Sequence, residues 1–135
     1  MQLGLHLPHA GEQATPGLIR RAALRAEDLG LDDVWVSEHI IVPRARFPRS
    51  PLFYDPVLSL TWAAAVTKRV RLGTSVLVLP MRHPLPLAKE LATLQNFSDG
   101  RLILSAPGSA GSRPSSPPWA CRSTSAGGAP TKASR

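Results

Sequence analysis

Two residues with acid–base chemistry, Glu38 and His39, stand side by side directly after an apolar segment, residues 33–37. An imidazole has an ordinary pKa near neutrality, so His39 can take up or release a proton during a reaction. If residues 33–37 form a strand of a parallel sheet, the pair lies at the carboxyl end of that strand, where α/β proteins bind their ligands. On the residues alone, a surface histidine at the start of a loop is the simpler interpretation.

Other candidate polar residues lie close to apolar segments. Thr74 and Ser75 interrupt a segment rich in Val and Leu, residues 70–79, whose composition alone predicts an ordinary buried strand. His6 and His9 stand near the first apolar segment and are candidates for lining a substrate pocket.

His83 is expected to have a structural role rather than a catalytic one. His83 precedes a proline and is expected to hold the loop after residues 70–79. Cys121 is the only cysteine, which excludes an internal disulfide. No cluster has the spacing of zinc ligands, so no metal site is expected.

The apolar pattern of residues 1–104 predicts alternating strands and helices. Two of the helical segments begin with a capping residue followed by proline, at Thr15-Pro16 and Asp55-Pro56. Gly30 is placed to end the first helix. The predicted strands are residues 2–7, 33–37, 70–79 and 101–104, and the predicted helices are residues 16–29, 56–65 and 84–97.

This alternation predicts an α/β protein, either an open doubly wound sheet or a (β/α)8 barrel. The chain has neither GxGxxG after the first strand nor GxxxxGK[ST], which weakens the nucleotide-binding versions of the open sheet. A barrel typically needs about 250 residues, and four strands cannot close one. The prediction is therefore a partial TIM barrel with an exposed sheet edge and apolar helix faces, and with a tendency to self-associate.

The net charge of +7 is unevenly distributed. All nine acidic residues precede Ser105, so residues 1–104 carry +3 (12 basic minus 9 acidic) and the remainder carries +4. No nucleic-acid-binding motif accompanies the charge, so nucleic acid is not an expected partner. No apolar run approaches the roughly 20 residues of a membrane span, and no signal peptide is recognisable, so a cytoplasmic location without membrane contact is expected.

Several segments, in this order along the chain, resemble the bacterial luciferase-like superfamily. They are AEDLGLDDVWVSEH at residues 26–39, RLGTSVLVLP at 71–80 followed by Arg82-His-Pro, Ala92-Thr-Leu, and SDGRLIL at 98–104. Within the superfamily, the resemblance is to the oxidoreductases that depend on the deazaflavin coenzyme F420. It covers residues 1–104, the region that matches the first four strands of the barrel.

The resemblance implies a set of site residues. His39 matches the catalytic histidine that faces the flavin or deazaflavin ring, and Glu38 matches the acid before it, which is commonly Asp. Thr74, Ser75 and Val76 match a bulge of the third strand, where a cis peptide bond, here between Ser75 and Val76, backs the central ring of the cofactor. These five residues are the predicted cofactor-binding residues.

The resemblance also implies a function, which is hydride transfer between F420 and a small-molecule substrate with His39 exchanging a proton. Two alternatives stay open. One is a monooxygenase that uses FMN in place of F420, and the other is a non-catalytic remnant without a ligand. Intact members of the family often dimerise, so a homo-oligomer is expected of a full-length relative.

Residues 105–135 form a second unit of different composition, with no Leu, Ile, Val, Phe, Met, Tyr or acidic residue. Such a basic Ser, Pro, Gly and Ala segment is predicted to be disordered. Family members continue here with a glycine-rich turn, an acidic, apolar helix and Val-Pro-Phe. One permitted codon choice for residues 118–125, read from its third base, encodes Leu-Gly-Val-Pro-Phe-Asp-Glu.

The hypothesis is therefore a change of reading frame near Ser105, which leaves a truncated chain without activity of its own. A short protein that evolved with a basic tail is the alternative.

Overall fold

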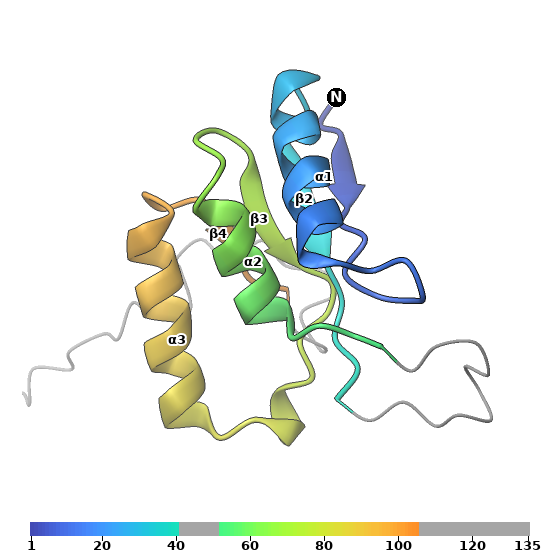
Figure 1. Ribbon diagram of the computed structural model, residues 1–135. Helices are drawn as coiled ribbons and strands as arrows, with labels where there is room; N and C mark the ends of the chain where they lie inside the picture. Colours follow the sequence, from blue (N-terminus) through green and yellow to red (C-terminus); the bar gives the residue numbers. More distant parts are fainter. Residues whose placement is uncertain (41–51, 106–135) are drawn as a thin grey trace, which may run out of the picture.

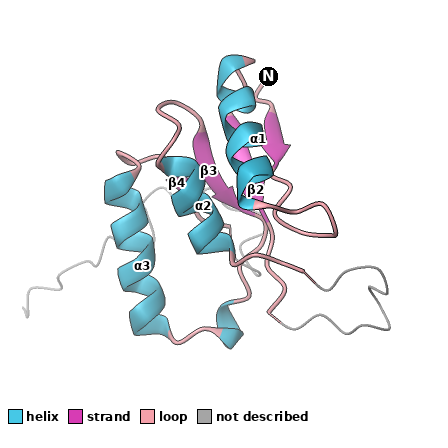
Figure 2. Cartoon of the chain, in the orientation of Figure 1, coloured by secondary structure: helices cyan, strands magenta, loops and turns pink. Residues whose placement is uncertain are grey.

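A computed structural model describes residues 1–40 and 52–105, so the predicted disordered tail beyond Ser105 lies outside the described residues. Strands and helices alternate in the order predicted (Figure 1, Figure 2). The elements are β1 (Gly4–His6), α1 (Pro16–Asp28), β2 (Asp33–Val36), α2 (Pro56–Ala64), β3 (Arg71–Thr74), the short 3₁₀ helix η1 (Leu79–Met81), α3 (Pro84–Phe97) and β4 (Leu102–Ile103).

The first two helices begin where their capping residues stand. The side chain of Thr15 accepts a hydrogen bond from the backbone N–H of Leu18, and that of Asp55 accepts one from the N–H of Leu58. Each bond satisfies a donor that the first helical turn leaves unpaired. After α1 ends, Gly30 adopts a φ of +77°, a conformation that glycine takes without steric cost.

The four strands form one parallel sheet in the order β1-β2-β3-β4. Consecutive strands are therefore neighbours, and each crossover contains one helix. All three helices lie on the same side of the sheet, in front of it in Figure 1. This arrangement places the carboxyl ends of all four strands at one edge.

The hydrophobic core lies between the sheet and the helices. Val34 of β2 and Leu72 of β3 are fully buried on the side of the helices, and Leu7, directly after β1, is almost fully buried with them. They pack against apolar residues of the helices, which include Ile19, Ala23, Leu60, Ala63, Leu87 and Leu94. Each helix thus buries an apolar face against the sheet, whereas Leu29 at the end of α1 stays exposed.

The opposite face of the sheet is covered in part by the indole ring of Trp35. A Cβ atom added to Gly73 would stand 2.2 Å from the ring atom Cε3, and one added to Gly4 would stand 2.6 Å from Nε1. Both glycines therefore leave room that the indole fills. A strand rich in Val and Leu is typical of a sheet covered on both faces, whereas the described helices cover one face of β3 only.

The third strand is shorter than predicted. The apolar pattern predicts a strand over residues 70–79, but the ladder with β2 ends at Thr74. Beyond that residue the backbone N–H groups find partners outside the ladder, since Leu77 donates to Ser105 and Val78 donates to the side chain of Glu38. The apolar residues after Thr74 therefore form a loop and η1 rather than a strand.

The amino edge of the sheet is held by charged side chains. Both carboxylate oxygens of Glu27, near the end of α1, accept hydrogen bonds from the backbone N–H groups of Lys68, Arg69 and Val70. The guanidinium of Arg101 donates to four backbone carbonyls, including those of α2 and of the turn before β3. These bonds fix the loops on the side opposite the predicted site.

Candidate functional site

His39 lies just beyond the carboxyl end of β2, and its side chain is exposed. The ring is in contact with the ring of Phe53, with centroids 4.6 Å apart and planes tilted by 33°. Phe53 belongs to the segment that returns toward β1, where it forms an antiparallel bridge with Ala10. The predicted catalytic imidazole is thus accessible at the strand-end edge and supported by an aromatic ring.

Ser75 and Val76 lie at the same edge, one strand further along the sheet. The peptide bond between them is cis, as the sequence resemblance predicted. Both residues are exposed, and the backbone N–H of Ser75 donates to the carbonyl of Val36 at 2.7 Å. That bond ties the segment to the end of β2, three residues before His39.

Glu38 is buried, and its neighbour His39 is not. One oxygen of the Glu38 carboxylate accepts from the N–H of Val78 at 2.5 Å, and the other accepts from Nε of Arg82 at 2.7 Å. The carboxylate is therefore engaged by the loop after β3. Its direct role in this structure is to hold that loop against the end of β2.

Thr74 is also fully buried. Its hydroxyl contacts both the backbone N–H and the carbonyl of Ser105, at 3.1 and 3.2 Å. The hydroxyl joins the end of β3 to the chain that leaves β4. Among the five predicted cofactor-binding residues, the structure thus places His39, Ser75 and Val76 on the surface, and Glu38 and Thr74 beneath it.

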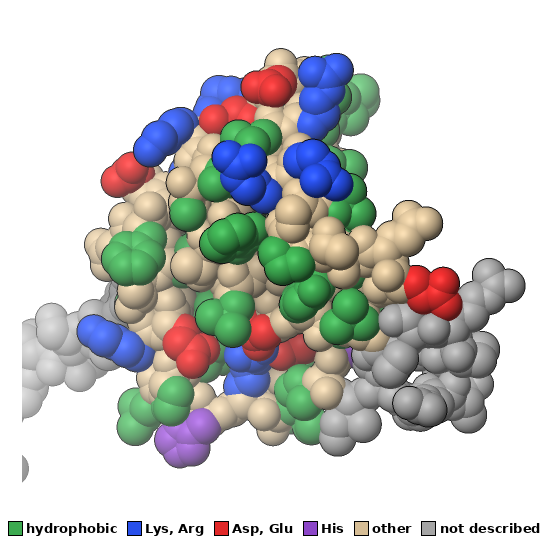
Figure 3. Space-filling model, viewed as in Figure 1, with side chains coloured by type: hydrophobic (Ala, Val, Ile, Leu, Met, Phe, Trp, Pro, Cys, Tyr) green, Lys and Arg blue, Asp and Glu red, His purple; other side chains and the backbone are tan. Residues whose placement is uncertain are grey.

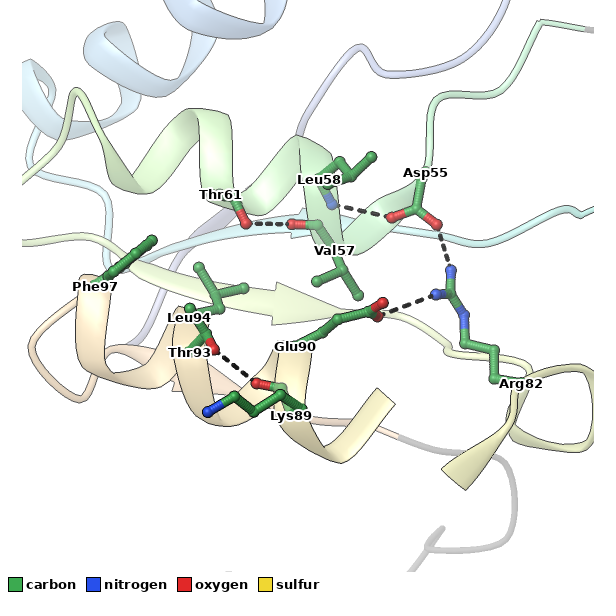
Figure 4. A pocket seen from close by; sticks show the side chains of 10 residues that line it. All are labelled: Asp55, Val57, Leu58, Thr61, Arg82, Lys89, Glu90, Thr93, Leu94 and Phe97. Carbon is green, nitrogen blue, oxygen red and sulfur yellow. Dashed lines mark hydrogen bonds and ion pairs between the residues drawn. The ribbon is translucent and has the colours of Figure 1, made fainter. Parts of the chain in front are cut away.

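Arg82 connects Glu38 to two further carboxylates, those of Asp55 and Glu90, which are drawn with it in Figure 4. Besides Glu38, its guanidinium contacts the carboxylate of Asp55 at 2.5 Å and that of Glu90 at 3.9 Å. Burial acts to lower the pKa of Arg82, but the hydrogen bonds to Glu38 and Asp55 outweigh it and raise the pKa. Arg82 therefore joins β2, α2, α3 and the loop after β3 as a permanent cation.

Two further histidines lie near His39, at the end of β1. His9 is completely buried, and its ring nitrogens contact the carbonyls of Leu7 and Ser37 at 3.0 and 2.7 Å. His6 is exposed and lies with its ring centroid 5.1 Å from that of His9. Burial and the neighbouring His9 lower the pKa of His6, against a hydrogen bond with Leu7 that raises it.

Sequence reasoning did not single out Arg82, Asp55 or Phe53 as site residues. Arg82 stood within a quoted motif and Asp55 within a capping signal, so neither indicated that the two side chains meet. Phe53 directly precedes Tyr54 in the sequence before the second helix. Nothing in that sequence indicates that its ring contacts His39. Their roles depend on contacts between residues that are 14 to 44 positions apart.

A groove of about 330 Å³ lies between α2 and α3, on the helix side of the sheet (Figure 4). It is lined by apolar residues, among them Leu58, Leu94 and Phe97, with Arg82 and Asp55 among its polar residues. His39, Ser75 and Val76 are not part of it. Within residues 1–40 and 52–105, no cluster of three or more His, Cys, Asp or Glu could hold a metal ion, and no helix is long and apolar enough to cross a membrane.

A parallel sheet with helices on one face and an accessible histidine at its strand-end edge is the arrangement of the α/β barrels. Comparison with known proteins also indicates an α/β barrel. Residues 1–111 match the family described as luciferase-like monooxygenase, and the chain belongs to this family. Its four parallel strands and three helices form part of the TIM barrel of the luciferase-like enzymes.

The relatives include F420-dependent enzymes and a monooxygenase. An F420-dependent glucose-6-phosphate dehydrogenase of Kineococcus radiotolerans is 41% identical over 96 residues, which cover 70% of this chain and 28% of the relative. The crystal structure of monooxygenase RslO1 from Streptomyces bottropensis is 37% identical, with a TM-score of 0.60, and the match covers 78% of this chain and 32% of that one.

A second solved structure is an F420-dependent secondary alcohol dehydrogenase in complex with an F420–acetone adduct. It is 28% identical with a TM-score of 0.65, and the match covers 78% of this chain and 31% of that one. The chain therefore spans less than a third of the length of these relatives.

Proposed function

We propose that this chain carries the ring-facing part of an F420 site, and that the function of the complete protein is F420-dependent oxidation or reduction of a small molecule. The observation that carries the proposal is that the exposed residues His39, Ser75 and Val76 lie beyond the carboxyl ends of the neighbouring strands β2 and β3, at the edge where barrel enzymes bind their substrates. The similarity to two F420-dependent dehydrogenases supports the choice of cofactor.

The described residues fit a flat, partly apolar ring. Val76 presents an exposed apolar side chain beside the exposed hydroxyl residue Ser75, and the imidazole of His39 is supported by Phe53. Ser75 and Val76 would lie against the ring, with His39 toward the substrate. Glu38 and Thr74 would act from below, by fixing the backbone on which these residues stand.

F420 supplies a carbon, C5, that accepts or donates a hydride. During oxidation of an alcohol, the hydride leaves the carbinol carbon, and His39 would accept the proton of the hydroxyl group. During the reverse reaction His39 would return that proton to the carbonyl oxygen. An imidazole can serve in both directions because its ordinary pKa lies near neutrality.

FMN-dependent oxygenation is the second candidate function. It is favoured by the similarity to a monooxygenase at 37% identity. Reduced FMN reacts with oxygen in a way that reduced deazaflavin does not, so the two functions differ in whether oxygen is consumed. The higher identity of the F420-dependent relative supports F420 as the first choice.

We further propose that the 135-residue chain has no dehydrogenase activity alone, because four strands do not close a barrel. The activity is best tested in a chimaera in which residues 1–104 replace the matching part of the Kineococcus radiotolerans enzyme. We expect the chimaera to reduce F420 with glucose 6-phosphate. His39→Gln in the chimaera should lower kcat by about 100-fold or more, the range typical of general acid–base catalysis, with little change in F420 affinity.

His83→Gln is the matched control, since His83 is an exposed histidine at the start of α3. It should leave kcat unchanged. A folded, F420-binding chimaera whose kcat is unchanged by His39→Gln would contradict the proposed role of His39. Consumption of oxygen in the presence of FMN, without turnover of F420, would favour the second candidate function.

A further inference from the structure

We infer that His9 is a positioning residue for His39, and that it acts on both the backbone before His39 and the ring of Phe53. Only the catalytic importance of this positioning rests on the proposed function, in which His39 transfers a proton. The positioning itself follows from contacts among residues 7–11, 36–39 and 52–54.

The side chain of His9 joins β1 and β2 beyond the point where their ladder ends. The ladder proper runs to the pair His6 and Trp35, and the N–H of Leu7 adds a last bond to the carbonyl of Trp35 at 2.7 Å. Nδ1 of His9 then lies 3.0 Å from the carbonyl of Leu7, and Nε2 lies 2.7 Å from the carbonyl oxygen and 3.2 Å from the backbone nitrogen of Ser37. The imidazole thereby continues the connection between the two strands.

This contact fixes the backbone two residues before His39. Ser37 is held on one side by His9, and Glu38 is held on the other side by Arg82 and Val78. With both preceding residues fixed, the direction in which the chain presents His39 is determined. Loss of the His9 contact would free the Ser37 peptide while leaving the Glu38 contacts in place.

The backbone of His9 holds the aromatic support of His39. The carbonyl of His9 accepts from the N–H of Tyr54 at 3.0 Å, and the N–H of Gly11 donates to the carbonyl of Leu52 at 2.9 Å. These bonds place Phe53 between the two imidazoles, edge-on to His9 at 6.2 Å and tilted against His39 at 4.6 Å. His9 is thus packed against the same ring that supports His39.

The position of Phe53 can be measured in solution. A phenyl ring 4.6 Å from an imidazole shifts the proton resonances of that imidazole through its ring current. The ring-proton shifts of His39 in the 135-residue chain therefore report whether Phe53 is in place. Phe53→Leu removes the aromatic ring but keeps an apolar side chain, and the change it produces calibrates the full effect.

Two substitutions at His9 separate its hydrogen bonds. His9→Gln can still reach Ser37 with its longer amide, whereas His9→Asn can reach only toward Leu7. We expect His9→Asn to lose about half or more of the ring-current shift that Phe53→Leu abolishes, and His9→Gln to retain most of it. Circular dichroism and the methyl spectrum of the core check that both variants are folded, and His83→Gln assigns an unrelated histidine.

A folded His9→Asn variant with the full wild-type shift at His39 would overturn the inference. So would equal loss in His9→Gln and His9→Asn, because it would indicate a general packing defect rather than the Ser37 contact. Titration of the wild-type chain with F420 is a separate arm. A wild-type chain that shows the His39 ring-current shift but no response to F420 would contradict the proposed function and leave the positioning by His9 intact.

Discussion

At the strand-end edge, residues that are adjacent in the chain differ in burial and in structural role. Glu38 is 5% exposed and holds the loop after β3, whereas His39 next to it is open to solvent. Thr74 and Ser75 differ in the same way. The exposed member of each pair is available to a ligand, and the buried member fixes the backbone that carries it.

The spacing of residues predicts which side chains share an edge, but it does not predict the partner of each one. Glu38 and Arg82 are 44 residues apart, and their contact forms only when the loop after β3 turns back. The family resemblance supplied His39 and the cis peptide. The role of Glu38 as an anchor for Val78 and Arg82 required the folded structure.

The hydrogen bonds of Glu38 with Val78 and Arg82 predict that Arg82→Ala strongly lowers the stability of the fold. The side chain of Glu38 is 1% exposed, so removal of the guanidinium leaves a buried carboxylate without its counter-charge. We expect the free energy of unfolding to fall by about 3 kcal/mol or more, as measured by urea denaturation. Lys89→Ala, an exposed cation in the same groove, should change it by no more than about 0.5 kcal/mol. Equal effects of the two substitutions would contradict the anchor.

The contact between Trp35 and Gly73 predicts a second effect at this scale. Gly73→Ala places a methyl group within 2.2 Å of the indole, so we expect a loss of about 1–3 kcal/mol in the free energy of unfolding. Gly17→Ala, in α1, has 3.5 Å to the nearest heavy atom and should be neutral or stabilising. Trp35→Val combined with Gly73→Ala should recover part of the loss, and strict additivity in this double-mutant cycle would argue against the contact.

At the scale of elements, the predicted order is confirmed and the predicted bounds are confirmed where local signals set them. The third helix was predicted as residues 84–97 and is observed as Pro84–Phe97, because a proline and the Ser98-Asp99-Gly100 turn mark its ends. The end of β3 was predicted five residues too late. Its limit is set by partners far along the chain, Val36, Glu38 and Ser105, which no local pattern reports.

The hydrogen bonds that Glu27 accepts at the amino edge of the sheet predict a pH dependence of the free energy of unfolding. Burial acts to raise the pKa of Glu27, but hydrogen bonds from the N–H groups of Arg69, Val70 and Lys68 outweigh it, so the pKa lies below its ordinary value of 4.5. Folding therefore gains stability from the ionised carboxylate above pH 4.5, and this gain is lost as the pH falls through 4.5 and below the folded-state pKa.

The prediction is tested by measuring the free energy of unfolding of Glu27→Gln and wild type between about pH 3 and 7. The difference between the two should be largest at neutral pH and should shrink as the pH falls. Asp28→Asn is the matched control because Asp28 is the exposed neighbour. A difference between wild type and Glu27→Gln that does not change with pH would contradict a stabilising role of the ionised Glu27 carboxylate.

At the scale of the whole molecule, the helix side of the sheet carries unburied apolar side chains (Figure 3). Leu58 and Trp62 of α2 and Leu85 and Phe97 of α3 are between 48% and 76% exposed. Together with the edges of β1 and β4, which pair with no further strand within residues 1–40 and 52–105, they predict self-association of the 135-residue chain. Sedimentation velocity at increasing concentration should show a rising mean mass.

Substitution of both Leu58 and Phe97 by Gln should weaken this self-association. Leu29→Gln is the control, since Leu29 is 60% exposed at the end of α1 and lies outside the groove. A wild-type chain that sediments as one monomeric species at all concentrations would contradict the prediction.

The hypothesis of a change of reading frame near Ser105 belongs to the same scale. The composition of the chain changes at Ser105. We expect the nucleotide sequence after Gly100 to encode, in another frame, Val-Pro-Phe and four further strand–helix units. A single continuous frame with codons that do not permit this reading would contradict the proposal.

The central claim is that His39, Ser75 and Val76 face the deazaflavin ring. Its most direct test is a titration of the ¹⁵N-labelled 135-residue chain with F420, with FMN in a parallel series. We expect F420 to shift the backbone resonances of Ser75 and Val76 and the ring resonances of His39, and to leave those of His83 unchanged. Shifts confined to the groove between α2 and α3, or no shift at the strand-end edge at any attainable concentration, would contradict it.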